Sequence, residues 1–116
     1  MLPIKSEVSW SDFCKLDIRV GSVEQAEAFL EARNPAIKLW INFGSEIGVM
    51  KTSAQITDHY RPDDLVGAQV LAVVNFPPKQ IGSFMSECLV LGAVEEDGGV
   101  VLLDVKSAVT NGLSVG

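Results

Sequence analysis

The sequence predicts an all-β domain, either a small closed β-barrel or a sandwich, that spans residues 1–116. At least five short apolar segments are separated by glycine and proline, as in small barrels and sandwiches. Long amphipathic helices do not alternate with these segments, which argues against a doubly wound parallel fold. Apolar residues make up 47% of the 116 residues, so the chain can build a hydrophobic core. Length and composition together favour one domain.

The N-terminal part of the chain predicts one short helix followed by a strand. Ser9 can cap the helix, with Asp12 three residues later as in a capping box. Apolar and polar residues then alternate from Leu16 to Val20, which indicates a half-buried strand. Gly21 interrupts the alternation, so we expect a bulge or a sharp bend there.

The remaining strands follow in order, separated by turns. A loop over 31–35 leads into a clearly alternating strand, and the polar stretch 57–65 predicts turns with a short helical turn. Turns are expected at 44–46, 95–99 and 111–112. The predicted strands are 37–43, one that starts over 47–50, and then 70–74, 87–94 and 100–105.

Charge and targeting signals limit the possible partners. The formal net charge of −6 argues against broad, non-specific binding of nucleic acid, although a local basic patch remains compatible with it. No apolar run is long enough to span a bilayer, so we expect no membrane insertion. The N-terminus does not resemble a signal peptide, and Cys14 and Cys88 share no motif. We therefore expect two reduced thiols and a cytoplasmic protein.

Residues for catalysis are scarce. His59 is the only histidine, and one imidazole without a nearby cysteine does not make a usual zinc site. The sequence contains no glycine-rich phosphate loop and no G-x-S-x-G elbow. We expect a protein that is not an enzyme and needs no cofactor or metal; an enzyme that uses His59 is a remote alternative.

The connection over residues 75–87 is unusually apolar. Only Lys79 and Glu87 are charged between residues 65 and 92. A surface connection rich in apolar groups is often an interface or a groove, and two prolines at 77–78 would hold it extended at low entropic cost. The alternative is a loop folded back onto the core. The large apolar side chains of this connection are Phe76, Ile81, Phe84 and Met85.

A polar patch follows the third predicted strand. Lys51, Ser53 and Gln55 place an ammonium group, a hydroxyl and an amide close together in an acidic protein. Such groups suit peptide backbone or a phosphate, although turn and capping roles would explain them equally well.

Several segments, in order, resemble the CsaA family of export-related chaperones. They are Asp17-Ile18-Arg19-Val20-Gly21, Pro35-Ala36-Ile37-Lys38-Leu39, Phe43-Gly44, Ser53-Ala54-Gln55-Ile56, Val73-Val74-Asn75-Phe76-Pro77-Pro78 and Ser86-Glu87-Cys88-Leu89-Val90-Leu91-Gly92. That family is similar to the tRNA-binding domains attached to methionyl- and phenylalanyl-tRNA synthetases. The resemblance implies a five-stranded oligonucleotide-binding (OB) barrel, a homodimer formed with terminal extensions, and binding of peptides or preproteins.

The resemblance can be compared position by position in the 75–87 connection. In tRNA-binding relatives this loop is rich in Lys and Arg and is followed by Ser-x-Gly-Met. Asn75, Pro78, Lys79 and Ser86 match, whereas Gln80 and Gly82 stand where relatives often carry basic residues, and Cys88-Leu89 replaces Gly-Met. Since Lys79 is nearly the only charge left for a phosphate, the loop favours a peptide groove over tRNA.

Two functional hypotheses follow. In the first, a chaperone groove binds unfolded or precursor polypeptides for export: Phe76, Ile81, Phe84 and Met85 hold side chains, Ser53, Gln55, Asn75 and Ser86 hold backbone, and Lys51 and Lys79 meet carboxyl groups. In the second, the barrel binds tRNA or structured RNA, with Phe76 and Phe84 stacking and Lys51, Lys79, Asn75 and Ser86 contacting the RNA.

Apolar residues near both termini predict a homodimer. Chain ends usually fray, so large apolar groups there call for a partner surface, and packing across a two-fold axis would supply one. The candidate interface residues are Trp10, Phe13, Val109, Leu113 and Val115.

Overall fold

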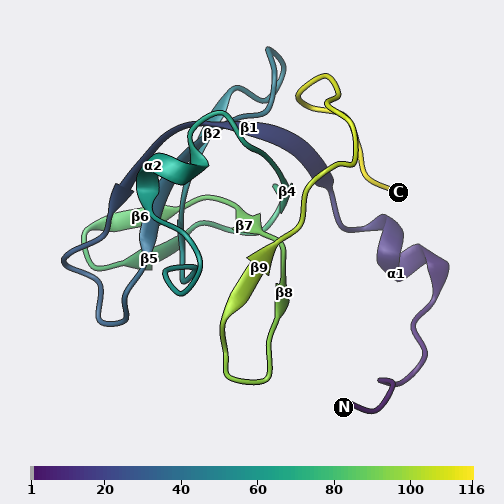
Figure 1. Cartoon of the computed structure of the whole chain (residues 1–116). Helices are drawn as coiled ribbons and strands as arrows, with labels where there is room; N and C mark the ends of the chain where they lie inside the picture. Colours follow the sequence, from purple (N-terminus) through teal and green to yellow (C-terminus); the bar gives the residue numbers. More distant parts are fainter. Residues whose placement is uncertain (1) are drawn as a thin grey trace.

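The computed structural model describes residues 2–116 and shows a nearly closed, five-stranded antiparallel barrel (Figure 1). The strand order is β3-β2-β1-β4-β7. The five strands are β1 (Ile18–Ala28), β2 (Ile37–Asn42), β3 (Val49–Ala54), β4 (Gln69–Val73) and β7 (Leu89–Val90). The all-β prediction is therefore confirmed, and the barrel is the alternative that forms.

Two hairpins and two short helices complete the fold (Figure 1). The first hairpin pairs β5 (Lys79–Ile81) with β6 (Phe84–Ser86), and the second pairs β8 (Gly92–Val94) with β9 (Val100–Leu102). The helices are α1 (Trp10–Cys14) and α2 (Pro62–Leu65). No helix among residues 2–116 is long and apolar enough to cross a membrane.

Strand β1 is shared by both halves of the barrel. Its first part, from Ile18 to Ser22, pairs with β4, and its second part, from Ser22 to Ala28, pairs with β2. The register shifts between Val23 and Gln25, so the irregularity expected at Gly21 lies further along the strand. A bulge adds local twist, which helps β1 to pair with both β2 and β4.

Gly21 has a packing role instead of a bulge. A Cβ atom at this position would lie 2.6 Å from Ile41 Cγ2 and 2.7 Å from Phe43 Cδ1. The missing side chain therefore lets two core side chains approach the β1 backbone. The strand begins two residues later than the alternation indicates, and Leu16 is exposed.

The core follows the alternation of β2. Ile37, Leu39 and Ile41 point inward and are at most 2% exposed, and Leu65 from α2 packs against them. Each such side chain contributes about 1.5–3 kcal/mol through burial. The rest of this cluster comprises Val23, Phe43, Ile56, Val70, Ala72 and Cys88.

The barrel closes between β3 and the segment that follows β6. The Glu87 N–H donates to the Lys51 carbonyl oxygen (2.8 Å), and the Lys51 N–H donates to Glu87 Oε1 (2.9 Å). The Ser53 N–H donates to Ser86 Oγ (3.2 Å). Two of these three bonds use side chains, so closure does not depend on a regular strand ladder.

The C-terminal segment lies along the first part of β1. The Val20 N–H donates to the Leu113 carbonyl (3.0 Å), and the Val115 N–H donates to the Ile18 carbonyl (2.8 Å). The Arg19 guanidinium bonds both Asp17 and the Gly112 carbonyl, which fixes the tail.

The N-terminal segment extends away from the barrel before α1 begins (Figure 1). Ser9 Oγ accepts the Asp12 N–H (3.1 Å), so the predicted cap is confirmed. The Trp10 and Phe13 rings lie 5.4 Å apart, and Trp10 is 73% exposed.

Two further segments differ from the sequence-based expectation. The single strand expected over 87–94 is divided into β7 and β8, because Leu91 donates its N–H to Leu71 and accepts a bond from the Leu103 N–H. The connection over 75–87 contains the β5–β6 hairpin, which turns at Gly82 with φ +60°.

Candidate functional site: a groove at the seam of the barrel

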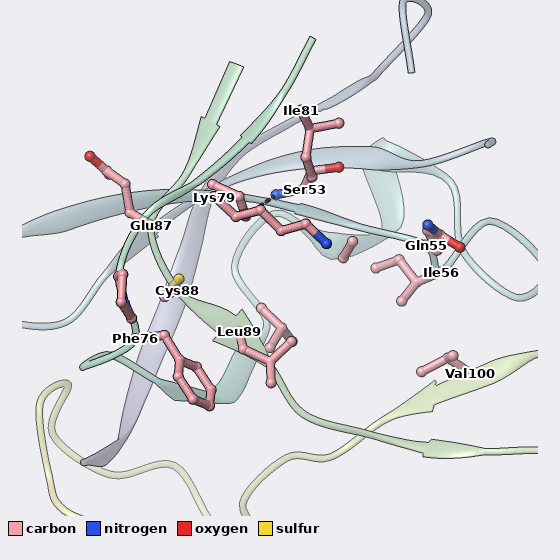
Figure 2. A pocket seen from close by; sticks show the side chains of 14 residues that line it. Ser53, Gln55, Ile56, Phe76, Lys79, Ile81, Glu87, Cys88, Leu89 and Val100 are labelled. Atoms are coloured by element: carbon pink, nitrogen blue, oxygen red, sulfur yellow. Dashed lines mark hydrogen bonds between the residues drawn. The ribbon is translucent and has the colours of Figure 1, made fainter. Parts of the chain in front are cut away.

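A groove of about 540 Å³ lies between the end of β3, the segment 86–90 and β5 (Figure 2). One wall is the end of β3 and the residues after it, another is β7, and β5 with Pro77 completes the lining. The lining residues are Ser53, Ala54, Gln55, Ile56, Phe76, Pro77, Lys79, Ile81, Ser86, Glu87, Cys88, Leu89, Val90 and Val100.

The walls of this groove are mainly apolar. Phe76 is 47% exposed and Leu89 is 50% exposed, and the two side chains lie on the same side of the groove (Figure 2). Ile56 and Val100 line the other end. Large apolar side chains left exposed in a concave site are typical of binding surfaces.

Lys79 provides a free positive charge in the groove. Its ammonium group points toward the middle of the cavity (Figure 2), and Lys79 has no ion-pair partner among residues 2–116. The carboxylate of Glu87 already accepts the backbone N–H of Lys51. The groove therefore favours a ligand that brings a carboxylate close to an apolar segment.

The Ser86 hydroxyl is part of the barrel closure. Thr52 Oγ1 donates to the Cys88 carbonyl (2.6 Å), so the 2.8 Å contact between Thr52 Oγ1 and Ser86 Oγ uses the Ser86 proton. Ser86 Oγ in turn accepts the Ser53 N–H. The hydroxyl can therefore accept, but not donate, a hydrogen bond from a ligand.

Phe84 is not a groove residue, which corrects its expected role as an anchor for ligand. It is 7% exposed and packs edge-on against Phe29 (5.5 Å between centroids) and Trp40 (6.1 Å). Trp40 alternates with the buried residues of β2, so this contact lies on the outer face of the sheet. Phe84 therefore attaches the β5–β6 hairpin to the barrel, as expected for a loop folded back onto its own chain.

Three other predicted residues also lie outside the groove lining. Asn75 accepts the Asp17 N–H (2.9 Å) and donates to the Lys15 carbonyl (2.8 Å), so it ties the start of β1 to the end of β4. Met85 is 39% exposed but does not line the groove. Lys51 places its ammonium 5.1 Å from the Phe84 ring centroid. The predicted residues that the groove does bring together are Ser53, Gln55, Phe76, Lys79, Ile81 and Ser86.

Sequence reasoning missed the β7 side of the groove. Leu89 and Val90 were expected only as part of a strand, and Val100 comes from a hairpin distant in sequence. One signal was present, because Cys88-Leu89 departs from the Gly-Met of tRNA-binding relatives. Burial raises the pKa of the Cys88 thiol to about 12, so this residue is an inert, protonated part of the wall.

Lys38, which lies outside the groove on β2, already has acidic partners. Lys38 lies 3.9 Å from Glu27 and 3.8 Å from Glu31, and its ammonium is 4.6 Å from the Phe29 ring centroid. A phosphate would compete with two carboxylates at this position. Lys38 on β2 is therefore a weak phosphate site.

The chain is similar to proteins of two kinds. Residues 18–114 match the family described as "Putative tRNA binding domain". The structure is similar to chaperone CsaA from Bacillus anthracis (TM-score 0.91, 51% identity, 96% of this chain and 100% of that one). It is also similar to the CsaA chaperone of Picrophilus torridus (TM-score 0.89, 47% identity, 95% of this chain and 100% of that one).

Methionine--tRNA ligases match as well, but only through a small part of their length. The ligase of Porphyromonas gingivalis is 34% identical over 113 residues, which are 97% of this chain and 16% of the ligase. The chain thus corresponds to about one-sixth of such a ligase. The barrel, the family match over most of the chain and the near-complete similarity to two CsaA structures agree, and the chain belongs to the tRNA-binding-domain family as a CsaA-type member with an OB-like fold.

Proposed function

We propose that this protein is a non-enzymatic cytoplasmic chaperone that binds unfolded or precursor polypeptides, for export, in the groove between β3 and β7. The observation that carries the proposal is the combination of exposed apolar walls with Lys79, which has no ion-pair partner in the described part of the chain. Such a site suits a short apolar segment next to an acidic group. The two similar structures named as CsaA chaperones support the same class of function.

The small number of apolar contacts that the groove offers supports weak and reversible binding. A large apolar side chain gains about 1.5–3 kcal/mol on burial. Two or three such contacts, less the cost of ordering the ligand, correspond to roughly micromolar dissociation constants. Affinity of this kind lets a chaperone release its client without a nucleotide cycle.

The homodimer is also part of the proposal, with residues 1–116 acting as one domain that dimerises through its terminal segments. Trp10 at 73%, Leu113 at 49% and Val109 at 37% are exposed in the single chain, and Phe13 lies beside Trp10. Val115 is tied to β1 through its backbone. Sedimentation of the wild type and of Trp10→Ala tests this: we expect a dimer that the substitution weakens, and a monomeric wild type at micromolar concentration would contradict it.

Titration of a dye-labelled unfolded peptide tests the groove. We expect Phe76→Ala to weaken peptide binding about tenfold, because one large apolar contact is lost. The control is Leu30→Ala, which removes an apolar side chain that is 86% exposed and lies outside the groove. Equal affinities for the two variants would contradict the proposal.

The second candidate function is binding of tRNA or structured RNA. The family description and the match to methionine--tRNA ligases favour it. Lys79 and Lys51 would contact phosphates, and the exposed Phe76 could stack on a base. So few charges give weak binding that falls steeply with salt. Tight binding of mixed tRNA at physiological salt, retained in Lys79→Ala, would contradict our preference for peptide.

A further inference from the structure

The groove lies along an incompletely paired edge of β3. In an antiparallel ladder, the backbone N–H and C=O of one residue point to the same side, and successive residues alternate sides. Lys51 and Ser53 direct their N–H groups away from β2, toward Glu87 and Ser86. Gln55 follows Ala54, the last residue of β3, and the same alternation extended by one residue directs its backbone away from β2.

Bonds to Glu87 and Ser86 satisfy only the first part of this edge. The N–H groups of Lys51 and Ser53 are bonded to Glu87 Oε1 and Ser86 Oγ. In the described part of the chain, the Ser53 carbonyl and the Gln55 N–H and carbonyl have no hydrogen-bond partner on that side. Gln55 is exposed, and both residues line the groove. Unpaired strand-edge groups of this kind are a template for another strand.

The apolar walls and the charge limit what can occupy this edge. Phe76 and Leu89 form an apolar surface beside the edge, and the Lys79 ammonium points into the same space (Figure 2). An extended segment places alternate side chains on one face, at a spacing that suits such a wall. A carboxylate on that segment complements Lys79.

We propose that the ligand binds by strand addition: an extended polypeptide segment with alternating apolar residues and one acidic side chain pairs its backbone with Ser53 and Gln55. This inference rests on the proposed function, because it specifies how the same groove holds a polypeptide. Backbone pairing supplies affinity that does not depend on the sequence of the ligand, and the apolar wall favours ligands in which apolar and polar residues alternate. A chaperone could thus accept many clients through one short edge.

An N-methyl scan of the ligand tests strand addition directly on the unmodified protein. The probe is a dye-labelled peptide that alternates leucine with serine and carries one glutamate, methylated at one backbone nitrogen at a time. We expect roughly two- to tenfold losses of affinity at the peptide nitrogens that face the edge and little change at their neighbours. A flat profile, or losses without alternation, would overturn strand addition.

A matched pair of protein variants tests the same hydrogen bonds by changing the protein instead of the peptide. Gln55→Pro removes the N–H, whereas Gln55→Ala keeps it and removes only the side chain. We expect a loss of about two- to tenfold for the proline variant relative to the alanine variant, with thermal unfolding as the check on folding. Equal affinities in two folded variants would contradict the proposal.

The tests distinguish failure of strand addition from failure of the groove as the binding site. If Phe76→Ala weakens binding but the N-methyl profile is flat, strand addition is wrong while the groove remains the binding site. If the peptide does not bind the wild-type protein, the proposed function itself is wrong.

Discussion

Phe84 should hold the β5–β6 hairpin against the barrel, and its truncation gives the most informative stability measurement. The ring is 7% exposed, makes two edge-on aromatic contacts with Phe29 and Trp40, and has the ammonium groups of Lys38 and Lys51 5.1 Å from its centroid. Phe84→Ala therefore removes burial, aromatic pairing and cation–π attraction together.

The expected cost follows from these contacts. Truncation of a buried phenylalanine to alanine costs about 3–5 kcal/mol, and a peripheral cluster that can relax lies near the lower limit. Phe84→Leu keeps most of the burial but loses two aromatic pairs, each worth about 0.5–1.5 kcal/mol. We expect losses of about 3 kcal/mol for alanine and about 1–2 kcal/mol for leucine.

Urea unfolding followed by far-UV circular dichroism measures both values. The control is Met85→Ala, the adjacent residue, which is 39% exposed and should cost under about 1 kcal/mol. A loss below about 1 kcal/mol for Phe84→Ala would refute the assignment of Phe84 as the hairpin anchor.

Three further predictions concern packing, pH and thiol reactivity. Gly21→Ala should cost about 1–3 kcal/mol in urea unfolding, because its Cβ would overlap core side chains; a neutral effect would show that the core gives way. The hydrogen bond to Glu95 raises the pKa of His59 in the folded protein. The contribution of this pair to folding stability is therefore fully present below about pH 6.5, and it is lost as pH rises through the folded-state pKa. The advantage in Tm of wild type over His59→Gln should shrink with rising pH, and a constant advantage would contradict this. Ellman's reagent should react quickly with the exposed Cys14 and with Cys88 only after unfolding, because burial raises the Cys88 pKa to about 12; two rapid equivalents would contradict the buried site.

Strands β1, β2 and β4 could be predicted because each carries a local apolar pattern, whereas β3 (Val49–Ala54) extends through residues 51–54, which the sequence placed in a polar patch after that strand. The alternation over β2 places Ile37, Leu39 and Ile41 inside without reference to the rest of the chain. The division of the 87–94 segment could not be predicted, because it depends on bonds from Leu91 to both Leu71 and Leu103. Such long-range pairing leaves no local signal.

The groove was only partly predictable for the same reason. The apolar 75–87 connection indicated a binding surface, and Phe76, Lys79 and Ile81 do line the groove. Composition could not tell which apolar residue faces a ligand and which faces the chain itself. The register of the hairpin decides that question, because it turns Phe84 onto Phe29 and Trp40. The unpaired backbone groups of Ser53 and Gln55 could be identified only from the hydrogen bonds of residues 2–116 in the folded chain.

A crystal structure of the protein with the leucine–serine peptide would examine the account most directly. The account predicts an extended peptide between the 53–56 segment and β7, with a side chain against Phe76 and its glutamate near Lys79. A peptide bound on another face of the barrel, with this groove left empty, would contradict it.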